Sequence, residues 1–167
     1  MAAVVGCDVG VRVAAGLALV ALVLAACGGG GSDGGGGPAF LSLPTERIVV
    51  GGVEMEAWIA GTAQAHADGL KDATAADLAP LPDGTPRAML FVFADAVDVA
   101  FWMRDTEVAL DLAYADGDGT IVAVHDLVPF DETAVPSPGP VRYALEARAG
   151  TLDAHGIVAG DGIVRAP

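Results

Sequence analysis

Two carboxylates stand inside strand-like stretches of the sequence. Asp111 interrupts the run VALDLAYA, and Glu146 interrupts VRYALEARA, in which apolar residues alternate with other residues. A carboxylate on a strand face can be buried, and burial raises its pKa toward the range of a general acid or base. Two such groups facing each other would resemble the acid pair of a glycoside hydrolase. One hypothesis is therefore a hydrolase that uses Asp111 and Glu146, with Arg104 holding an anionic group.

Structural roles for the same residues are the favoured interpretation, because ion-pair networks also perturb titrating groups. Asp111 would then cap backbone N–H groups or pair with Arg104. Glu146 would pair with Arg142 or Arg148 across a solvated face. Whether the protein is an enzyme stays open at this point.

A polar corner follows an aromatic pair in FWMRDT, residues 101–106. Trp102 could offer a flat ring to a sugar or peptide, with Arg104, Asp105 and Thr106 beside it as polar contacts. Trp58 and Trp102 each lie opposite the apolar stripe of their own strands. Because aromatic residues make up only 5% of the chain, core packing is the favoured alternative for both rings. The sequence predicts a binding surface of Trp102, Arg104, Asp105 and Thr106.

Signals for metals and cofactors are weak. His125, followed by Asp126, is a single histidine without ligand spacing. The segment ADGDGT has Ile121, not glycine, at the sixth position from Asp116, so it predicts a hairpin turn and not a calcium loop. The sequence contains no G-x-S-x-G elbow, phosphate-binding loop or dinucleotide fingerprint. We therefore predict neither a metal nor a cofactor.

The elements that position these residues are expected to be short strands. Gly51-Gly52 and the DGDG segment at 116–119 each separate two strand-like runs and predict hairpins. The expected strands are ERIVV, VEMEAWIA, AMLFVF, VDVAFWM, VALDLAYA, TIVAVHDLV, VRYALEARA and a closing hairpin within GIVAGDGIVRA. About seven or eight short strands with frequent turns predict a mainly β domain, a single compact sandwich or small barrel.

One or two short helices are expected between the strands. Thr62 can cap a helix that ends near Gly69, and Thr151 can cap a helical turn that ends at Gly156. A loop is expected between the first helix and about Pro86. These helices are too short to change the mainly β character of the domain.

The first 27 residues have the layout of a bacterial export signal. Arg12 provides a positive start, and residues 13–23 form an apolar stretch shorter than the roughly 20 residues of a membrane span. LAAC at 24–27 resembles a lipobox, in which the signal is cleaved and Cys27 becomes a lipid-modified N-terminus. We predict a lipoprotein signal peptide at residues 1–27. Because Asp8 is unusual in such a start, translation from Val11 is a further hypothesis.

A glycine-rich segment, residues 28–44, follows the signal and is expected to be a flexible tether. The β-rich domain then spans residues 45–167. Cys7 would be removed with the signal and Cys27 would carry the lipid, so the domain would contain no thiol and no disulfide. Its stability must come from its core.

The net charge restricts the partners. A formal charge of −14 argues against nucleic acid, whose phosphates favour Lys and Arg, and against electrostatic docking on anionic lipid. The expected partners are the membrane, through lipidated Cys27, and a small molecule, a glycan or an envelope protein. We predict an exported, lipid-anchored protein that faces the periplasm or the cell surface.

Six stretches together resemble the family known as domain of unknown function 192. They are GL at 69–70, MLFVF at 89–93, FWMRDT at 101–106, LDLAYAD at 110–116, YALEARAG at 143–150 and GIVAGD at 156–161. The resemblance covers residues 46–166 and implies a jelly-roll-like β-sandwich, often exported or lipid-anchored, without an assigned activity. The family usually has Asn where Asp105 stands and Pro where Ala109 stands. Taken as a whole, the sequence predicts a non-enzymatic binding domain, with the hydrolase as the alternative.

Overall fold

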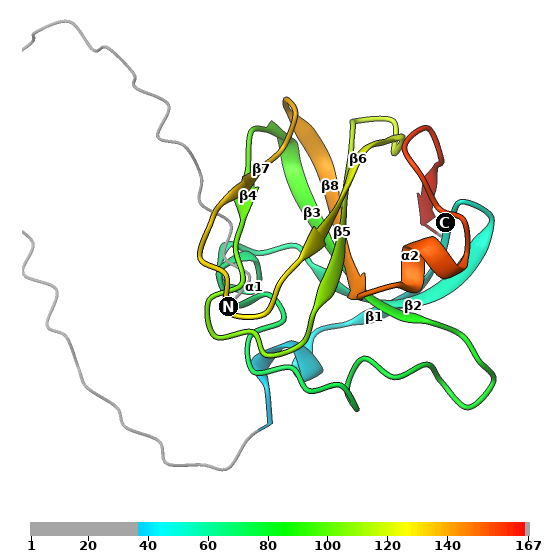
Figure 1. Ribbon diagram of the computed structural model, residues 1–167. Helices are drawn as coiled ribbons and strands as arrows, with labels where there is room; N and C mark the ends of the chain where they lie inside the picture. Colours follow the sequence, from blue (N-terminus) through cyan, green and yellow to red (C-terminus); the bar gives the residue numbers. More distant parts are fainter. Residues whose placement is uncertain (1–36, 166–167) are drawn as a thin grey trace, which may run out of the picture.

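The computed structural model describes residues 37–165, which form a mainly β domain with two short α-helices (Figure 1). The elements are η1 (Ala39–Ser42), β1 (Thr45–Val50), β2 (Val53–Ala60), α1 (Ala63–Asp68), β3 (Arg87–Val97), β4 (Ala100–Phe101), β5 (Leu110–Ala115), β6 (Ile121–Leu127), β7 (Val135–Pro136), β8 (Val141–Arg148), α2 (Thr151–Ala154) and β9 (Ile163–Arg165). The prediction of a mainly β fold is confirmed.

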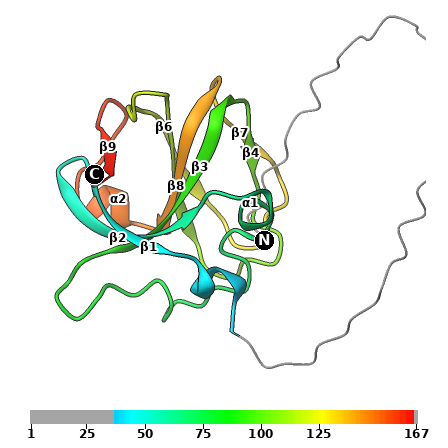
Figure 2. The same cartoon turned by 180° about the vertical axis from the view of Figure 1, so that it is seen from behind.

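Seven strands form one strongly curled sheet in the order β6-β5-β8-β3-β2-β1-β9, and β4 pairs with β7 in a separate ribbon (Figures 1 and 2). Neighbouring strands are antiparallel, except that β2 and β3 are parallel. The two edges of the sheet meet at a bridge between Thr120 and Gly162. The Ile163 N–H donates to the Gly119 carbonyl at 2.7 Å, so the sheet is a half-barrel that closes at one end.

Glycines make this closure and the first hairpin possible. Gly119 has a φ of +85°, and a Cβ there would lie 2.6 Å from the Ile163 carbonyl oxygen. Gly51 and Gly52 both have positive φ, as a tight two-residue turn between β1 and β2 requires. Both predicted hairpin turns are therefore confirmed.

The ends of α1 agree with the prediction from the sequence, but the N-cap of α2 does not. The Thr62 hydroxyl accepts from the Ala65 N–H at 3.1 Å, and Gly69 ends α1, as predicted. Gly150, however, is the N-cap of α2, and Thr151 is its first residue. The predicted hairpin within residues 156–166 is wrong, because β9 pairs with β1, far away in the sequence.

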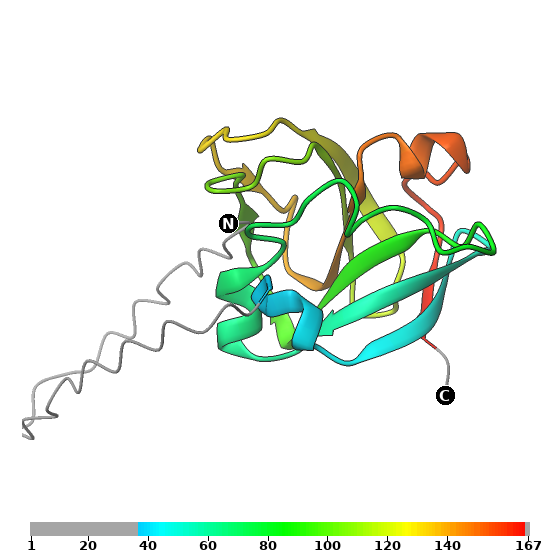
Figure 3. The same ribbon diagram turned by 90° about the horizontal axis from the view of Figure 1, so that it is seen from below.

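Both faces of the sheet are buried, which explains why two sets of apolar residues alternate along the strands. Figures 2 and 3 show α1 and α2 on opposite sides of the sheet. One core, which we call the ribbon-side core, contains Met89, Phe91 and Tyr114 and lies toward α1 and the β4–β7 ribbon. The other core contains Leu90 and Leu145 and lies toward α2.

The packed domain begins earlier than predicted. Phe40 in η1 is buried and packs edge-on against Trp58, with 5.0 Å between the ring centroids. The last residues of the predicted tether, 38–44, therefore belong to the domain, because Phe40 fills the ribbon-side core.

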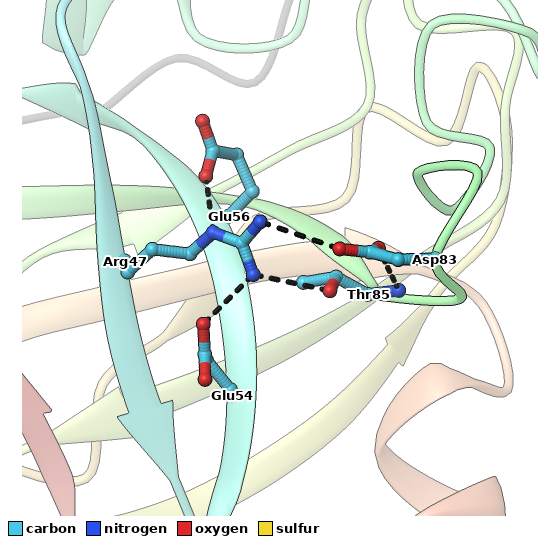
Figure 4. Close-up of polar contacts among 5 residues, drawn as sticks. All are labelled: Arg47, Glu54, Glu56, Asp83 and Thr85. Atoms are coloured by element: carbon cyan, nitrogen blue, oxygen red, sulfur yellow. Dashed lines mark hydrogen bonds and ion pairs between the residues drawn. The ribbon is translucent and has the colours of Figure 1, made fainter.

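An arginine ties the long segment between α1 and β3 to the first hairpin. Arg47 binds Glu54 and Glu56 at 2.8 Å each, reaches Asp83 at 3.6 Å and donates to the Thr85 hydroxyl at 3.1 Å (Figure 4). The group is exposed, so each single pair contributes little. The two carboxylates of β2 orient Arg47, and its contacts with Asp83 and Thr85 join the segment to the hairpin.

Candidate functional site

Asp111 has a structural role in β5. Its side-chain oxygens accept from the Gly150 N–H at 2.9 Å and the Leu152 N–H at 2.8 Å. The residue is 3% exposed. The capping role predicted for Asp111 is confirmed, and it fixes the start of α2. The alternative pairing with Arg104 does not occur, because Arg104 binds Glu132.

Glu146 is fully buried on β8, opposite Met89 on β3 and Leu112 on β5. Neither of its carboxyl oxygens has a hydrogen-bond partner in the described part of the chain. Burial raises the pKa of Glu146 to about 8, so the carboxyl is mainly uncharged at pH 7. The predicted pairing with Arg142 or Arg148 on a solvated face is wrong.

The two carboxylates do not converge. Asp111 lies opposite Ala147, and Glu146 lies opposite Leu112, on the same pair of antiparallel strands. Directly opposite residues share a face and successive residues alternate, so Asp111 and Glu146 point to opposite sides of the sheet. The hydrolase hypothesis, which requires both groups in one cleft, is wrong on this geometry.

Trp102 is half-buried and covered by Arg104. The Arg104 guanidinium carbon lies 4.4 Å from the centroid of the Trp102 ring, within the range of a cation–π contact. The same guanidinium donates to Glu132 at 2.7 Å and 3.1 Å. The Trp102 Nε1 is buried and has no partner among the described residues. Trp58, in contrast, is part of the ribbon-side core.

Asp105 stands at a left-handed turn, with a φ of +57°. The Thr106 N–H closes this turn on the Met103 carbonyl at 3.2 Å, and the Asp105 carbonyl accepts from the Asp72 N–H at 3.3 Å. Asn and Asp adopt this backbone conformation more readily than other residues that carry a Cβ. Asp105 therefore preserves the turn, and the Asn that the resemblance implies at this position would do the same. Thr106 is fully buried behind it.

Three loops meet at this turn around a depression of about 600 Å³, which we call the corner pocket. Its lining consists of Lys71, Asp72, Thr74, Asp105, Glu107 and Phe130. Within residues 37–165, the non-glycine residues with positive φ are Asp72, Asp105 and Phe130, and all three line this pocket. Such conformations persist where the surrounding structure imposes them, and they cluster at ligand sites.

Phe130 adds an unusual apolar group to the corner pocket. The residue is 64% exposed, and a bulky residue at positive φ is rare. The Phe130 N–H donates to the Thr106 carbonyl at 3.2 Å, which joins its loop to the turn.

The sequence predicted only part of this pocket. Asp105 lines it, Thr106 lies buried behind it, and Trp102 and Arg104 form the adjacent stacked pair. Asp72 and Phe130 were missed because they come from other loops. The one available signal was an aromatic residue, Phe130, in the loop PFDETAVPSPGP, which contains four prolines.

The other candidates have structural explanations. His125 is half-exposed and packs edge-on toward Tyr114, with 5.9 Å between the ring centroids. The described residues contain no group of three side chains suited to hold a metal ion. Asp116 accepts from the N–H groups of Asp118 and Thr120, as in a hairpin turn.

Predictions for the export signal, for Cys27 and for the tether up to residue 36 lie outside the described residues. None of the helices within residues 37–165 is long and apolar enough to span a membrane.

Comparison with known proteins gives a family and a fold but no activity. Residues 46–164 match the model of the DUF192 family, described as "Uncharacterized ACR". A solved protein of unknown function from Novosphingobium aromaticivorans DSM 12444 is 26% identical with a TM-score of 0.65, over 80% of this chain and 99% of that one. A Sinorhizobium meliloti 1021 protein, provisionally named a transcription regulator, is 27% identical with a TM-score of 0.65, over 74% and 95%. No curated protein matches the chain.

Proposed function

The chain belongs to the DUF192 family, and we propose that it is a non-enzymatic binding domain held at the cell envelope by a lipid on Cys27. The observation that carries the binding role is the meeting of Asp72, Asp105 and Phe130, all at positive φ, around the corner pocket. Three unfavourable backbone conformations at one place are costly for folding. A ligand that uses the resulting geometry accounts for their presence.

The lining of the corner pocket indicates the class of ligand. Asp72, Asp105 and Glu107 provide carboxylate oxygens, and Thr74 provides a hydroxyl. These groups accept hydrogen bonds from hydroxyl or ammonium donors. The exposed ring of Phe130 offers an apolar face on which a sugar ring can stack. A glycan or an amino sugar combines both features.

The neighbouring stacked pair of Trp102 and Arg104 would support this site from beside the pocket. Glu132 binds Arg104, and this contact raises the pKa of the guanidinium, so Arg104 stays charged above Trp102. The pair thus holds the strand segment before the turn and keeps Asp105 in place. In this proposal Trp102 and Arg104 position the site, while Asp105 contacts the ligand.

The envelope location rests on the sequence alone. LAAC at 24–27 precedes a glycine-rich stretch, which would let the domain stand away from a membrane. The provisional name of the Sinorhizobium meliloti relative is not transferred to this chain. A net charge of −14 opposes binding to DNA.

The binding role is tested by NMR titration of the purified protein with two probes, a soluble N-acetylglucosamine oligomer and the amine spermidine. We expect one of them to shift the amide signals of residues 71–74, 103–107 and 130. Phe130→Ala should abolish these shifts and leave the melting temperature within about 2 °C of the parent, because the ring is largely exposed. Shifts that persist in Phe130→Ala, or that map elsewhere, would contradict the proposal.

A further inference from the structure

We propose that Arg87, Arg148 and His155 form a second site, which binds a small phosphate or phosphate monoester. They line a pocket of about 290 Å³ between the segment before β3, the end of β8 and α2. Figure 3 shows that the segment between α1 and β3 runs past the end of the sheet toward α2. This pocket is separate from the corner pocket, because the two share no lining residue.

The two arginines are direct neighbours across the sheet. Ala88 lies opposite Ala147 in the antiparallel pair of β3 and β8. The next step of this register places Arg87 opposite Arg148, on one face of the sheet. Like charges directly opposite each other destabilise a sheet, since their Cβ atoms are about 5 Å apart. An anion bound between the guanidinium groups would remove this cost.

No carboxylate among the described residues lines the pocket beside these arginines. Within residues 37–165, neither Arg87 nor Arg148 forms an ion pair, and no Asp or Glu lines the pocket. Arg47 is the contrasting case, since three carboxylates surround it (Figure 4). The chain has 22 acidic and 8 basic residues, so a pocket lined by two arginines and no acidic residue is unexpected.

The acidic residues near the pocket are engaged elsewhere. The Asp77 carboxylate accepts from the backbone N–H and the hydroxyl of Thr74, at 2.8 Å and 2.6 Å, and the Asp77 backbone carbonyl accepts from Arg87. The hydrogen bonds from Thr74 lower the pKa of Asp77, and the charge of Arg87 adds to this effect without forming an ion pair. Asp83 accepts from the Thr85 N–H and reaches Arg47. Asp153 lines the depression around Asp111, on another side of α2.

Arg87 is already held in position to receive an anion. Its Nη1 donates to the Asp77 carbonyl at 3.0 Å, and its guanidinium carbon lies 5.6 Å from the centroid of the Trp58 ring. These contacts occupy one face of the Arg87 guanidinium and one of its N–H donors. Its remaining N–H groups can donate to an anion. Arg148 and His155 are exposed, and within residues 37–165 their side chains have no hydrogen-bond partner. Binding would therefore cost little rearrangement.

The number and geometry of the donors favour phosphate over a carboxylate. A guanidinium group presents parallel N–H donors that match two oxygens of a phosphate or carboxylate. Two guanidinium groups opposite each other, with an imidazole and the Thr151 hydroxyl beside them, can surround a group with three or four oxygens. A planar carboxylate would leave part of these donors unused.

The test measures the melting temperature of the purified protein against increasing inorganic phosphate, glycerol phosphate, acetate and sodium chloride at matched ionic strength. We expect a saturable increase with phosphate or glycerol phosphate, and a smaller one with acetate and chloride. Arg148→Gln should weaken the apparent affinity about tenfold, as for the loss of a charged hydrogen-bonding partner. Arg142→Gln is the matched control, because Arg142 lies on the same strand and outside the pocket.

Stability without added anion separates binding from a structural role. If Arg148 serves binding, Arg148→Gln in chloride alone should melt at or above the temperature of the parent, because the repulsion from Arg87 is removed. Equal responses to phosphate and chloride in the parent would overturn the proposal. An unchanged phosphate response in Arg148→Gln, or an equal loss in Arg142→Gln, would also overturn it.

Discussion

Asp111 and Glu146 lie one register step apart on adjacent antiparallel strands, and their side chains leave the sheet on opposite faces. Each is buried, but the surroundings differ. Asp111 meets two backbone N–H groups at the start of α2, whereas the Glu146 carboxyl finds no partner among the described residues. Asp111 therefore serves as a backbone cap, whereas burial holds the Glu146 carboxyl mainly neutral.

Removal of the Asp111 carboxylate should destabilise the domain. In Asp111→Ala, the N–H groups of Gly150 and Leu152 lose their acceptor, and we expect the free energy of unfolding to fall by about 2–4 kcal/mol in urea titrations. Asp126 lies opposite Asp111 on β6 and is exposed, so Asp126→Ala should change the stability by less than about 0.5 kcal/mol. Equal losses in the two variants would contradict the capping role.

Glu146 should make the stability of the domain depend on pH. Its pKa is about 8 in the folded state, and its ordinary value is 4.5. The folded state therefore binds more protons than the unfolded state between these values, and the free energy of unfolding falls as the pH rises from about 4.5 to 8. Above pH 8 the penalty for burying the charge is complete. A raised pKa of Tyr114, caused by burial and by the nearby Glu146 charge, accompanies this effect.

Glu146→Gln removes the titrating group and retains the shape of the side chain. We expect the variant to lose most of the decrease in stability between pH 5 and pH 8, which is on the order of 3–4 kcal/mol for a shift of this size. Denaturant titrations at several pH values measure it. Glu107→Gln, at an exposed position, should keep the pH dependence of the parent. An identical pH dependence in Glu146→Gln would show that Glu146 is not buried as a neutral acid.

Local signals in the sequence predict the turns and α1 well. Gly51-Gly52 and the segment at 116–119 are chemically suited to tight turns, and Thr62 and Gly69 delimit α1. These features depend on a few neighbouring residues, so the sequence contains the necessary information.

Long-range pairing limits what the sequence can reveal about the site. Alternation shows which residues share a face of one strand, but the relation between Asp111 and Glu146 depends on the register of β5 against β8. The same limit hid the pairing of β9 with β1 and the meeting of Asp72 and Phe130 with Asp105. Glu146 was expected at a solvated face because nothing in its own strand shows that both faces are covered.

The turn at Asp105 should tolerate Asn and reject a β-branched residue. Its φ of +57° suits Asn, so Asp105→Asn should keep the melting temperature of the parent. Asp105→Val should lower the free energy of unfolding by about 1–2 kcal/mol, because its branched Cβ clashes with the backbone at positive φ. Thermal unfolding of the two variants measures this. Similar stability of the Val and Asn variants would contradict a left-handed turn at this position.

Membrane attachment should depend on Cys27 and not on Cys7. If the lipobox is used, Cys27→Ala prevents lipid attachment, and the protein should move from the membrane fraction to the soluble or uncleaved fraction after cell lysis. Cys7→Ala is the matched control, because it changes the other cysteine of the chain and should leave the distribution unchanged. Mass spectrometry of the parent should find acyl chains on a peptide that begins at Cys27. A Cys27→Ala protein that remains in the membrane with a cleaved N-terminus would refute the lipid anchor, and binding at the corner pocket could still be tested on the same variant.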